Sequence, residues 1–519
     1  MKKRGLALLC VFAMVVSSLA GCGGGSGEEV QSAQGTEGTA GGELKDTITF
    51  AKGTDVTSLD PHIGKQLAAF SVTCNMFEQL VALDDNMVPQ PSLAESWEQI
   101  NDLEWRFHLR DDVTWHNGEP FTADDVKFSY ERMQAMASVA NNIAFLDTVT
   151  VEDEHTVVLK TKYPYSSLLA GISTPPCSIV PKSVVEADED GFALNPIGTG
   201  PYKFVEWKPD ESVTMEAYED YWGEPAKTKY LVMKVVPEAT QRSIMLETGE
   251  IDVAYDIAPN DVARLKETEG INVLIGDSMK ISNLHFNCSS DGPIGDKRVR
   301  QAIAYAIDRQ GIVDGVLSGI GEPGILPVSK SAVGFDETIE AIPYDPEKAK
   351  ELLIDAGYPD GFECTVWVDD DQVYTEVATV IQSMLAEVGI TMNIETMKQA
   401  TKQDRLVNHQ DFDLNMSFQN NIVGDADYSL YSNLMADSAS NFSYYVNPEV
   451  EALILQERST FEEEKRQQLF HQIYEIIMDE LPILNLYDEQ ICVGVSDNVQ
   501  GLTLNKIGAH KYQNVTVSN

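Results

Sequence analysis

The stretch YDPEKAKELLIDAGYP, residues 344–359, carries the local signals of a complete α-helix. Asp345 stands at the N-cap position, and Gly357 lies where the apolar spacing stops. A second helical pattern, TEVATVIQSMLAEVG at residues 375–389, leads directly into ITMNIET at residues 390–396, where apolar residues alternate. Helices that run straight into strands are typical of α/β lobes, so the sequence predicts an α/β fold.

Further helices are predicted on both sides of this unit. Residues 296–317 fit one amphipathic helix, and residues 462–480 fit another that Pro482 ends. A helix over residues 121–133 begins with Thr122 and Asp125 in a near capping box. The chain beyond its first 44 residues is too long for one hydrophobic core, so we expect at least two lobes.

The N-terminus predicts export. MKKRGLALLCVFAMVVSSLAGC has basic residues, a short apolar segment and small residues before Cys22. It resembles a bacterial lipoprotein signal peptide over residues 1–21, with Cys22 acylated; the alternative is an ordinary cleaved signal with an incidental cysteine. Residues 22–44 have almost no apolar side chains and predict a flexible tether. We therefore expect an extracytoplasmic protein anchored to the cell membrane, in the periplasm or at the cell surface.

Charge and cysteine spacing exclude several classes of partner. The formal net charge is −45, which argues against nucleic acid and anionic lipid, because both require basic patches. The cysteines of the mature body lie far apart without a CxxC pair, so a zinc site is not indicated. Buried thiols are expected, and a single disulfide stays open. These cysteines are Cys74, Cys177, Cys288, Cys364 and Cys492.

The sequence carries none of the common catalytic frames. It has no GxSxG, HExxH or GxxxxGK[ST] motif, and no cysteine with a plausible histidine partner. The glycine-rich NPIGTGPYKF, residues 195–204, is followed by a strand pattern rather than the helix that would hold a phosphate. We therefore expect a protein that is not an enzyme and that binds neither a metal nor a cofactor.

Two carboxylates one residue apart, Asp425 and Asp427, lie in NNIVGDADYSLY, residues 420–431. An EF-hand starting at Asp425 would need Gly and Glu where Leu430 and Ala436 stand, so that calcium loop is excluded. Two interpretations remain: the aspartates contact a ligand, or they hold the loop by accepting hydrogen bonds from backbone N–H groups.

Several stretches, taken in order, resemble the extracytoplasmic substrate-binding proteins of ABC importers, in the oligopeptide, dipeptide and nickel group of family 5. The strongest is WRFHLRDDVTWHNGEPFTADDVKFSYERM at residues 105–133. The others are FAKGTDVTSLDPH (50–62), NMFEQLVALDDNMVPQPSLAESWE (75–98), NPIGTGPYKFVEW (195–207), LETGEIDVAYD (246–256), DKRVRQAIAYAIDR (296–309), YDPEKAKELLIDAGYPDGF (344–362) and YYVNPEVEALI (444–454).

The resemblance implies a two-lobed, periplasmic-binding-protein-like α/β clamp (type II, cluster C) with an extra inserted α/β domain. Lobe I would comprise residues 45–80, 198–282 and 495–519. The inserted domain would span residues 81–197, and lobe II residues 283–494. Ligand would bind between the lobes and favour their closure, which a membrane permease then recognises.

The resemblance also suggests site residues, and the chain departs from the dipeptide-binding pattern there. Asp425 and Asp427 match an Asp-Pro-Asp element, but counting back without gaps puts Gln419 and Ile422 where those relatives have a stacking Trp and an amine-binding Asp. The region that supplies their carboxylate-binding Arg matches WVDDDQVYTE, residues 367–376, which contains no Arg. A zwitterionic dipeptide is therefore disfavoured.

The resulting candidate ligand contacts come from three segments. Lys65, in PHIGKQ, could pair with an anion, although a surface lysine is the common alternative. The polar FQNN, residues 418–421, would suit a peptide or a saccharide, and its alternative is a loop that hydrates itself. The candidates are Lys65, Gln66, Trp367, Phe418, Gln419, Asn420, Asn421, Asp425 and Asp427.

The leading hypothesis is a monomeric, lipid-anchored receptor that delivers oligopeptides to an ABC permease, because a peptide backbone can be bound without fixing its side chains. The alternatives are the same role for another small solute such as an oligosaccharide, a sensor without a permease, and a secreted surface hydrolase. Nickel chelates are least favoured, since no histidine lies near residues 418–427.

Overall fold

The computed structural model of the chain describes residues 44–64, 67–408 and 412–519. The predicted signal peptide, Cys22, Lys65 and Gln66 therefore lie outside the described residues. The predicted tether does too, except for Leu44, which forms a β-bridge with Ser518.

The largest sheet has eleven strands, in the order β15-β14-β16-β12-β17-β11-β1-β10-β9-β8, with β13 beside β17. We call β11, β1, β10, β9 and β8 the first half of this sheet, and β16, β14 and β15 the second half. In the first half β1 is parallel to β10 and β11, and in the second half β14 is parallel to β15 and β16. The strands of the first half are β1 (Thr47–Lys52), β8 (Tyr202–Lys208), β9 (Ser212–Ala217), β10 (Tyr230–Val235) and β11 (Val253–Tyr255). Those of the second half are β14 (Phe362–Asp369), β15 (Ile390–Met397) and β16 (Leu414–Asn420).

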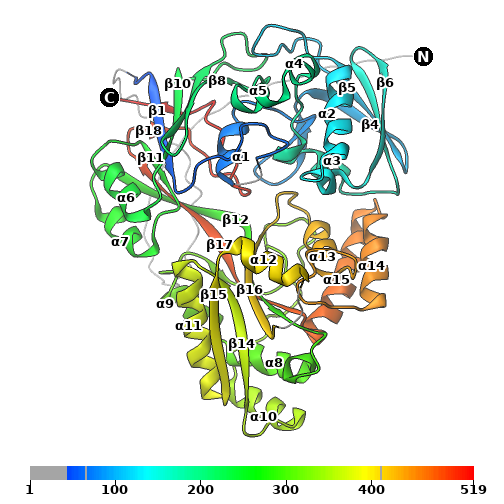
Figure 1. Cartoon of the computed structure of the whole chain (residues 1–519), viewed down its shortest axis with the longest axis vertical. Coiled ribbons are helices and arrows are strands. Elements are labelled where there is room, and N and C mark those ends of the chain that lie inside the picture. Colours follow the sequence, from blue (N-terminus) through cyan, green and yellow to red (C-terminus); the bar gives the residue numbers. More distant parts are fainter. Residues whose placement is uncertain (1–43, 65–66, 409–411) are drawn as a thin grey trace, which may run out of the picture. The chain divides into compact units, whose positions relative to one another are not determined.

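Two long strands, β12 (Ile271–Phe286) and β17 (Ile483–Ser496), connect the halves (Figure 1). They are antiparallel to each other; β17 also pairs with β11, and β12 also pairs with β16. The short β13 (Glu322–Pro323) pairs with β17.

A separate four-stranded sheet, in the order β4-β5-β7-β6, lies within the range predicted for the inserted domain. Its strands are β4 (Ala94–Asn101), β5 (Glu104–Leu109), β6 (Leu146–Asp153) and β7 (Thr156–Thr161). Two hairpin-like pairs complete the strands: β2 (Val81–Leu83) with β3 (Pro89–Pro91), and β18 (Val499–Gln500) with β19 (Thr516–Val517). Each half of the large sheet and the four-stranded sheet has its own buried apolar cluster, as expected for a chain too long for one core. The domain boundaries themselves stay a prediction.

The helices of the first part of the chain are α1 (Leu67–Thr73), α2 (Ala123–Ala135), α3 (Leu168–Ile172), α4 (Lys182–Ala187), α5 (Glu189–Leu194), α6 (Ala239–Glu247) and α7 (Pro259–Glu267). Those of the second part are α8 (Lys297–Ala306), α9 (Arg309–Gly315), α10 (Pro346–Ala356), α11 (Gln372–Glu387), α12 (Gln399–Asn408), α13 (Ala426–Leu434), α14 (Pro448–Arg458) and α15 (Glu463–Glu480). Short 3-10 turns occupy Ala140–Ile143, Pro175–Cys177 and Pro293–Gly295.

Local signals correctly predicted both ends of α10 and the start of α2. Asp345 Oδ1 accepts from Lys348 N–H at 2.9 Å at the start of α10, and Gly357 follows its end with φ +96°. The capping box of α2 is confirmed, with Thr122 N–H donating to Asp125 Oδ2 at 3.0 Å.

One helix prediction was wrong. Residues 296–317 form two helices, α8 and α9, instead of one. Asp308 interrupts the helix because its carboxylate accepts from Gly311 N–H at 2.9 Å and caps a new helix. Of the described cysteines, all five are free thiols, so the disulfide that the sequence left open is absent from this part of the chain.

Candidate functional site

The topology makes the carboxyl ends of both sets of parallel strands face each other. β1 and β11 end at Lys52 and Tyr255. β12 runs in the same direction as these strands, because both β11 and β12 are antiparallel to β17. β16 runs against β12 and ends at Asn420, opposite Lys280. In open α/β sheets, ligands bind outside the carboxyl ends of strands, so the region along β12 between Tyr255 and Asn420 is the candidate site.

Lys280 of β12 is the centre of a cluster of polar and aromatic side chains in this region. Its Nζ lies 2.6 Å from Glu489 Oε2 on β17, donates to Tyr374 Oη at 3.0 Å, and sits 4.4 Å from the ring centroid of Phe418. Tyr374 Oη donates to Glu489 Oε1 at 3.2 Å, and Ser282 Oγ donates to the same oxygen at 2.9 Å. We call these five residues the Lys280 cluster.

Ring stacking and an irregularity in β12 shape the geometry of the Lys280 cluster. The rings of Tyr374 and Phe418 stack with centroids 6.0 Å apart and planes 19° apart. The pairing of β12 with β17 shifts register between Asp277 and Ile281, an irregularity that can redirect the side chains beside it. The cluster therefore holds one cation and one anion against a pair of aromatic faces.

The charges in the cluster follow from burial and from Glu489. Burial opposes the charge of Lys280, but the Glu489 carboxylate outweighs burial and raises the pKa of Lys280 above its usual value. Burial, reinforced by Glu489, raises the pKa of Tyr374 well above its usual value. At neutral pH Lys280 is thus an ammonium and Tyr374 a neutral hydroxyl.

The four predicted contacts at the end of β16 divide into two kinds. Phe418 belongs to the Lys280 cluster, and Asn420 Oδ1 is a buried acceptor without a hydrogen-bond partner in the described chain. By contrast, Gln419 Oε1 accepts from Asn433 Nδ2 at 3.1 Å. Asn421 is 1% exposed and donates to the Asp425 carbonyl at 2.7 Å. Phe418 and Asn420 remain available to a ligand, whereas Gln419 and Asn421 bind their own chain.

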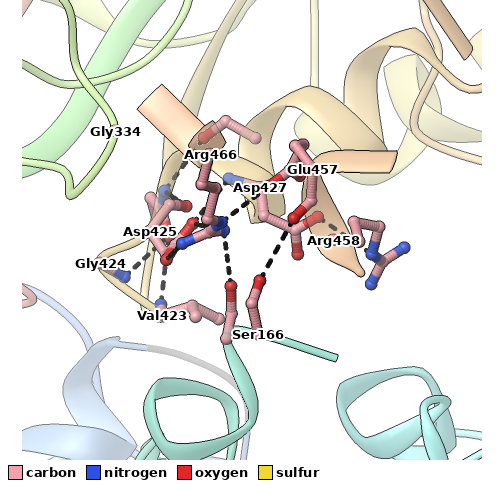
Figure 2. Close-up of polar contacts among 12 residues, drawn as sticks. Ser166, Gly334, Val423, Gly424, Asp425, Asp427, Glu457, Arg458 and Arg466 are labelled. Carbon is pink, nitrogen blue, oxygen red and sulfur yellow. Dashed lines mark hydrogen bonds and ion pairs between the residues drawn. The ribbon is translucent and has the colours of Figure 1, made fainter. Parts of the chain in front are cut away.

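Asp425 and Asp427 are held by arginines from α14 and α15 (Figure 2). Arg466 donates to both oxygens of Asp425 at 2.7 Å, and Arg458 Nε lies 3.0 Å from Asp427 Oδ1. Asp425 also accepts from Asp427 N–H at 2.9 Å, which caps α13. Both aspartates are buried, at 4% and 1% exposure. Their contacts support the interpretation that these aspartates hold the loop, and any direct ligand contact would have to displace an arginine.

A third carboxylate, Glu457, completes this cluster. Its Oε2 accepts from Arg466 Nε at 3.0 Å, while its Oε1 and both oxygens of Asp427 are buried without a well-aligned hydrogen bond. Burial, together with the charge of Asp427, raises the pKa of Glu457 well above its usual value. Burial also raises the pKa of Asp427, against the opposing charge of Arg458. Burial and the like charge of the neighbouring carboxyl therefore both favour protonation of one of these two acids.

The same arginines contact the segment before α3 (Figure 2). Arg466 Nη2 donates to Ser167 Oγ at 2.8 Å, and Ser166 N–H donates to the Arg458 carbonyl at 2.8 Å. The Arg458 guanidinium also lies 5.1 Å from the ring centroid of Tyr165. These contacts join the range predicted for the inserted domain to the range predicted for lobe II.

Trp367 is part of the core. It is 1% exposed, lies 5.2 Å from the Phe412 ring, and has the Arg405 guanidinium 3.9 Å from its ring centroid. In the same region Asp369 forms a buried ion pair with Lys402 at 2.9 Å. A ligand cannot reach Trp367 in this arrangement, so its predicted contact with ligand is not supported by the structure.

Four members of the Lys280 cluster were missed from the sequence: Lys280, Tyr374, Ser282 and Glu489. Lys280 and Glu489 lie on strands far apart in the chain, and a lone lysine or glutamate in a strand gives no local signal. Tyr374 lies within residues 367–376, where the family resemblance points to an arginine and not to a tyrosine. The pairing of β12 with β17 brings Lys280 and Glu489 together, and Tyr374 joins them from the first turn of α11.

Within residues 44–64, 67–408 and 412–519, no group of three or more His, Cys, Asp or Glu side chains is arranged to hold a metal ion. No helix in this part of the chain has the length and apolar character needed to cross a bilayer.

Comparison with known proteins gives consistent matches. Residues 88–441 match the model of the bacterial extracellular solute-binding proteins, family 5, middle region. The dipeptide-binding protein of Escherichia coli K12 is 28% identical over 460 residues, covering 82% of this chain and 86% of that protein. Heme-binding protein A of Haemophilus influenzae is 28% identical over 462 residues, covering 82% and 84%.

A solved structure agrees with these sequence matches. The periplasmic binding protein DppA from Helicobacter pylori, in complex with the peptide STSA, has a TM-score of 0.81 and 26% identity, and the match covers 92% of this chain and 99% of that one. It confirms the predicted two-lobed, periplasmic-binding-protein-like α/β fold. The family model covers more than half of the chain, and the chain therefore belongs to the bacterial extracellular solute-binding proteins of family 5, the binding proteins of ABC importers.

Proposed function

We propose that the solutes of this ABC-importer binding protein are oligopeptides, captured between the facing carboxyl ends of the two halves of the large sheet. The observation that carries the proposal is the Lys280 cluster with the neighbouring Asn420, at the end of β16. It combines an aromatic face, a cation and an unpaired amide oxygen in one place.

The chemistry of this place suits a peptide backbone. Asn420 Oδ1 is buried without a donor among the described residues, and leaving such an acceptor unpaired costs about 1–3 kcal/mol. A peptide N–H from the ligand would satisfy it. Phe418 and Tyr374 offer apolar surface to a side chain without selecting its identity. Recognition of this kind favours peptides of varied sequence.

Ligand binding would act on the permease by closing the two halves of the sheet around the ligand. A ligand that touches both halves of the sheet has its full affinity only when they approach, so it shifts the population toward the closed state. The permease then distinguishes loaded from empty protein by conformation. No chemical step is asked of the binding protein, and the family consists of binding proteins rather than enzymes.

An oligosaccharide is the second candidate. The stacked Tyr374 and Phe418 rings beside the Asn420 amide would also suit a sugar ring and its hydroxyl groups. A melting-temperature screen separates the two, because a ligand that binds only the folded protein raises its melting temperature. Peptides of three to eight residues should stabilise the protein and neutral oligosaccharides should not. Stabilisation by sugars alone would contradict the proposal.

Anchoring is proposed from the N-terminal sequence. Acylation of Cys22 after removal of residues 1–21 would hold the receptor at the membrane as a monomer beside its permease. Metabolic labelling with a radioactive fatty acid should mark the natural protein and not the Cys22→Ser variant. Equal labelling of both proteins would refute the anchor.

A further inference from the structure

Lys52, the last residue of β1, is a buried lysine without a charged partner. It is 3% exposed, and across the described residues it takes part in no ion pair and its ammonium in no hydrogen bond. Its Nζ lies 4.8 Å from the centroid of the Tyr255 ring. Lysines are seldom fully buried unless they are paired, because an unpaired ammonium loses its hydration without compensation.

A second buried cation lies beside it. Arg242 is also 3% exposed, and in the described part of the chain its guanidinium donates to backbone carbonyls instead of a carboxylate. These include the carbonyls of Tyr255 and Val236, each at 2.8 Å. The first half of the sheet therefore presents at its carboxyl edge two buried cations that form no ion pair with another described residue, in a chain whose formal net charge is −45.

The acid nearest to this pair is Asp256, which does not neutralise Lys52. Asp256 follows β11, is exposed, and has a left-handed backbone with φ +52°. It does not come within ion-pair distance of Lys52. Burial lowers the pKa of Lys52, although the Asp256 charge opposes that shift; in turn the charges of Lys52 and Arg242 outweigh burial and lower the pKa of Asp256.

The surface under Lys52 is rigid. The Tyr255 ring is stacked on His510 with centroids 4.8 Å apart and planes 16° apart. Its hydroxyl hydrogen-bonds Tyr512 Oη at 2.8 Å, and Phe50 packs edge-on against the ring at 5.8 Å. The aromatic face beneath the Lys52 ammonium is thus in place before any ligand arrives, which reduces the entropy lost on binding.

We propose that Lys52 binds a carboxylate of the solute, and that for an oligopeptide this is the C-terminal carboxylate. The inference rests on the proposed function and adds a charge requirement to it. A monoanion matches the single ammonium of Lys52. Lys52 lies at the end of β1 in the first half of the sheet, whereas Phe418 and Asn420 lie at the end of β16 in the second half. One peptide would therefore contact both halves of the sheet. Lys52 would supply the anion contact that the sequence suggested for Lys65 and that residues 367–376 lack.

The test compares synthetic tri- to hexapeptides that have either a free or an amidated C-terminus. Affinities are measured by calorimetry on the wild-type protein, on Lys52→Met, and on Lys208→Met as a control. Lys208 is half exposed and pairs only with Glu206 in the described structure. The wild type should bind free acids about 10- to 100-fold more tightly than amides, as expected for one charge-assisted hydrogen bond. Lys52→Met should lose this preference, and Lys208→Met should keep it.

Melting temperatures without ligand give an independent readout. Lys52→Met removes an unpaired buried charge and keeps an unbranched apolar chain, so it should melt at the same or a higher temperature. A lower melting temperature would mark Lys52 as structural and overturn the inference. Equal affinity of the wild type for acids and amides would overturn it while leaving peptide capture intact. Failure of both peptide forms to bind would overturn the proposed function and this inference with it.

Discussion

Replacement of Arg466 by Met should produce a large loss of stability that shrinks in acid. The Arg466 side chain is 11% exposed and binds both oxygens of Asp425, whose own side chain is 5% exposed. Breaking a buried ion pair by removing one partner costs about 3–5 kcal/mol, because the other charge is left buried and unpaired. The two carboxyls of Asp427 and Glu457 beside it add to the repulsion.

Protonation of the carboxylate that Arg466 leaves unpaired limits the loss of stability. Without Arg466, the stranded carboxylate can take up a proton, and this costs an ordinary aspartate about 4 kcal/mol at pH 7 and about 1.5 kcal/mol at pH 5. The free energy of unfolding of Arg466→Met should therefore fall by about 3–4 kcal/mol at pH 7, and by less than half of that at pH 5. Adding Asp425→Asn should recover part of the loss at pH 7, since the unpaired charge is then gone.

Urea unfolding at both pH values measures this effect. Arg106→Met is the matched control, because Arg106 makes an ion pair with the more exposed Glu98, and exposed pairs contribute little. A loss below about 1 kcal/mol at pH 7, or the same loss at both pH values, would refute the claim that Arg466 neutralises a buried carboxylate.

Three further predictions concern the site, the pH response and the backbone. Phe418→Ala should weaken peptide binding about 10-fold by removing the ring that stacks on Tyr374, and Phe418→Tyr should retain binding; equal calorimetric affinities for all three proteins would exclude a role for the ring. Burial lowers the pKa of His62 from its usual value to about 4. As the pH falls below about 6.5, His62 therefore becomes protonated in the unfolded chain but stays neutral in the folded chain. Stability should therefore drop by about 2 kcal/mol at pH 5 from this group, and denaturant titrations of His62→Gln should show a flatter pH dependence; an unchanged dependence would contradict the assignment. Gly361→Ala should destabilise more than Gly357→Ala, because both have left-handed φ but only at Gly361 would a Cβ meet a backbone oxygen, at 1.8 Å; equal melting temperatures would count against this contact.

Local sequence signals predicted those parts of the fold that depend on near neighbours. The start of α10 follows from Asp345 and its end from Gly357, both within the same few residues. The break between α8 and α9 was missed because the apolar spacing continues across Asp308, and only the hydrogen bond to Gly311 shows that a new helix begins. The spacing of apolar residues alone does not reveal a cap in the middle of a pattern.

The sequence predicted only those candidate site residues that lie beside a local motif. Phe418 and Asn420 could be found because they end a strand beside a recognisable Asp-x-Asp element. The structure buries Trp367 in a core, and the sequence could not show this, because an aromatic residue in a strand has the same sequence pattern whether it faces a ligand or a core. Lys280 and Glu489 form their ion pair only because β12 pairs with β17 in the folded chain. Residues whose role depends on long-range pairing are invisible to motif searches on one sequence.

Backbone hydrogen exchange of the protein with and without a bound peptide tests most directly that ligand is held between the facing strand ends. Added peptide should slow exchange at residues 278–282, 416–421 and 487–490, which carry the Lys280 cluster and Asn420. It should also slow exchange at the ends of β1 and β11, while the four-stranded sheet β4-β5-β7-β6 stays unchanged. Protection confined to that sheet, or binding without protection of β12 and β16, would contradict the account.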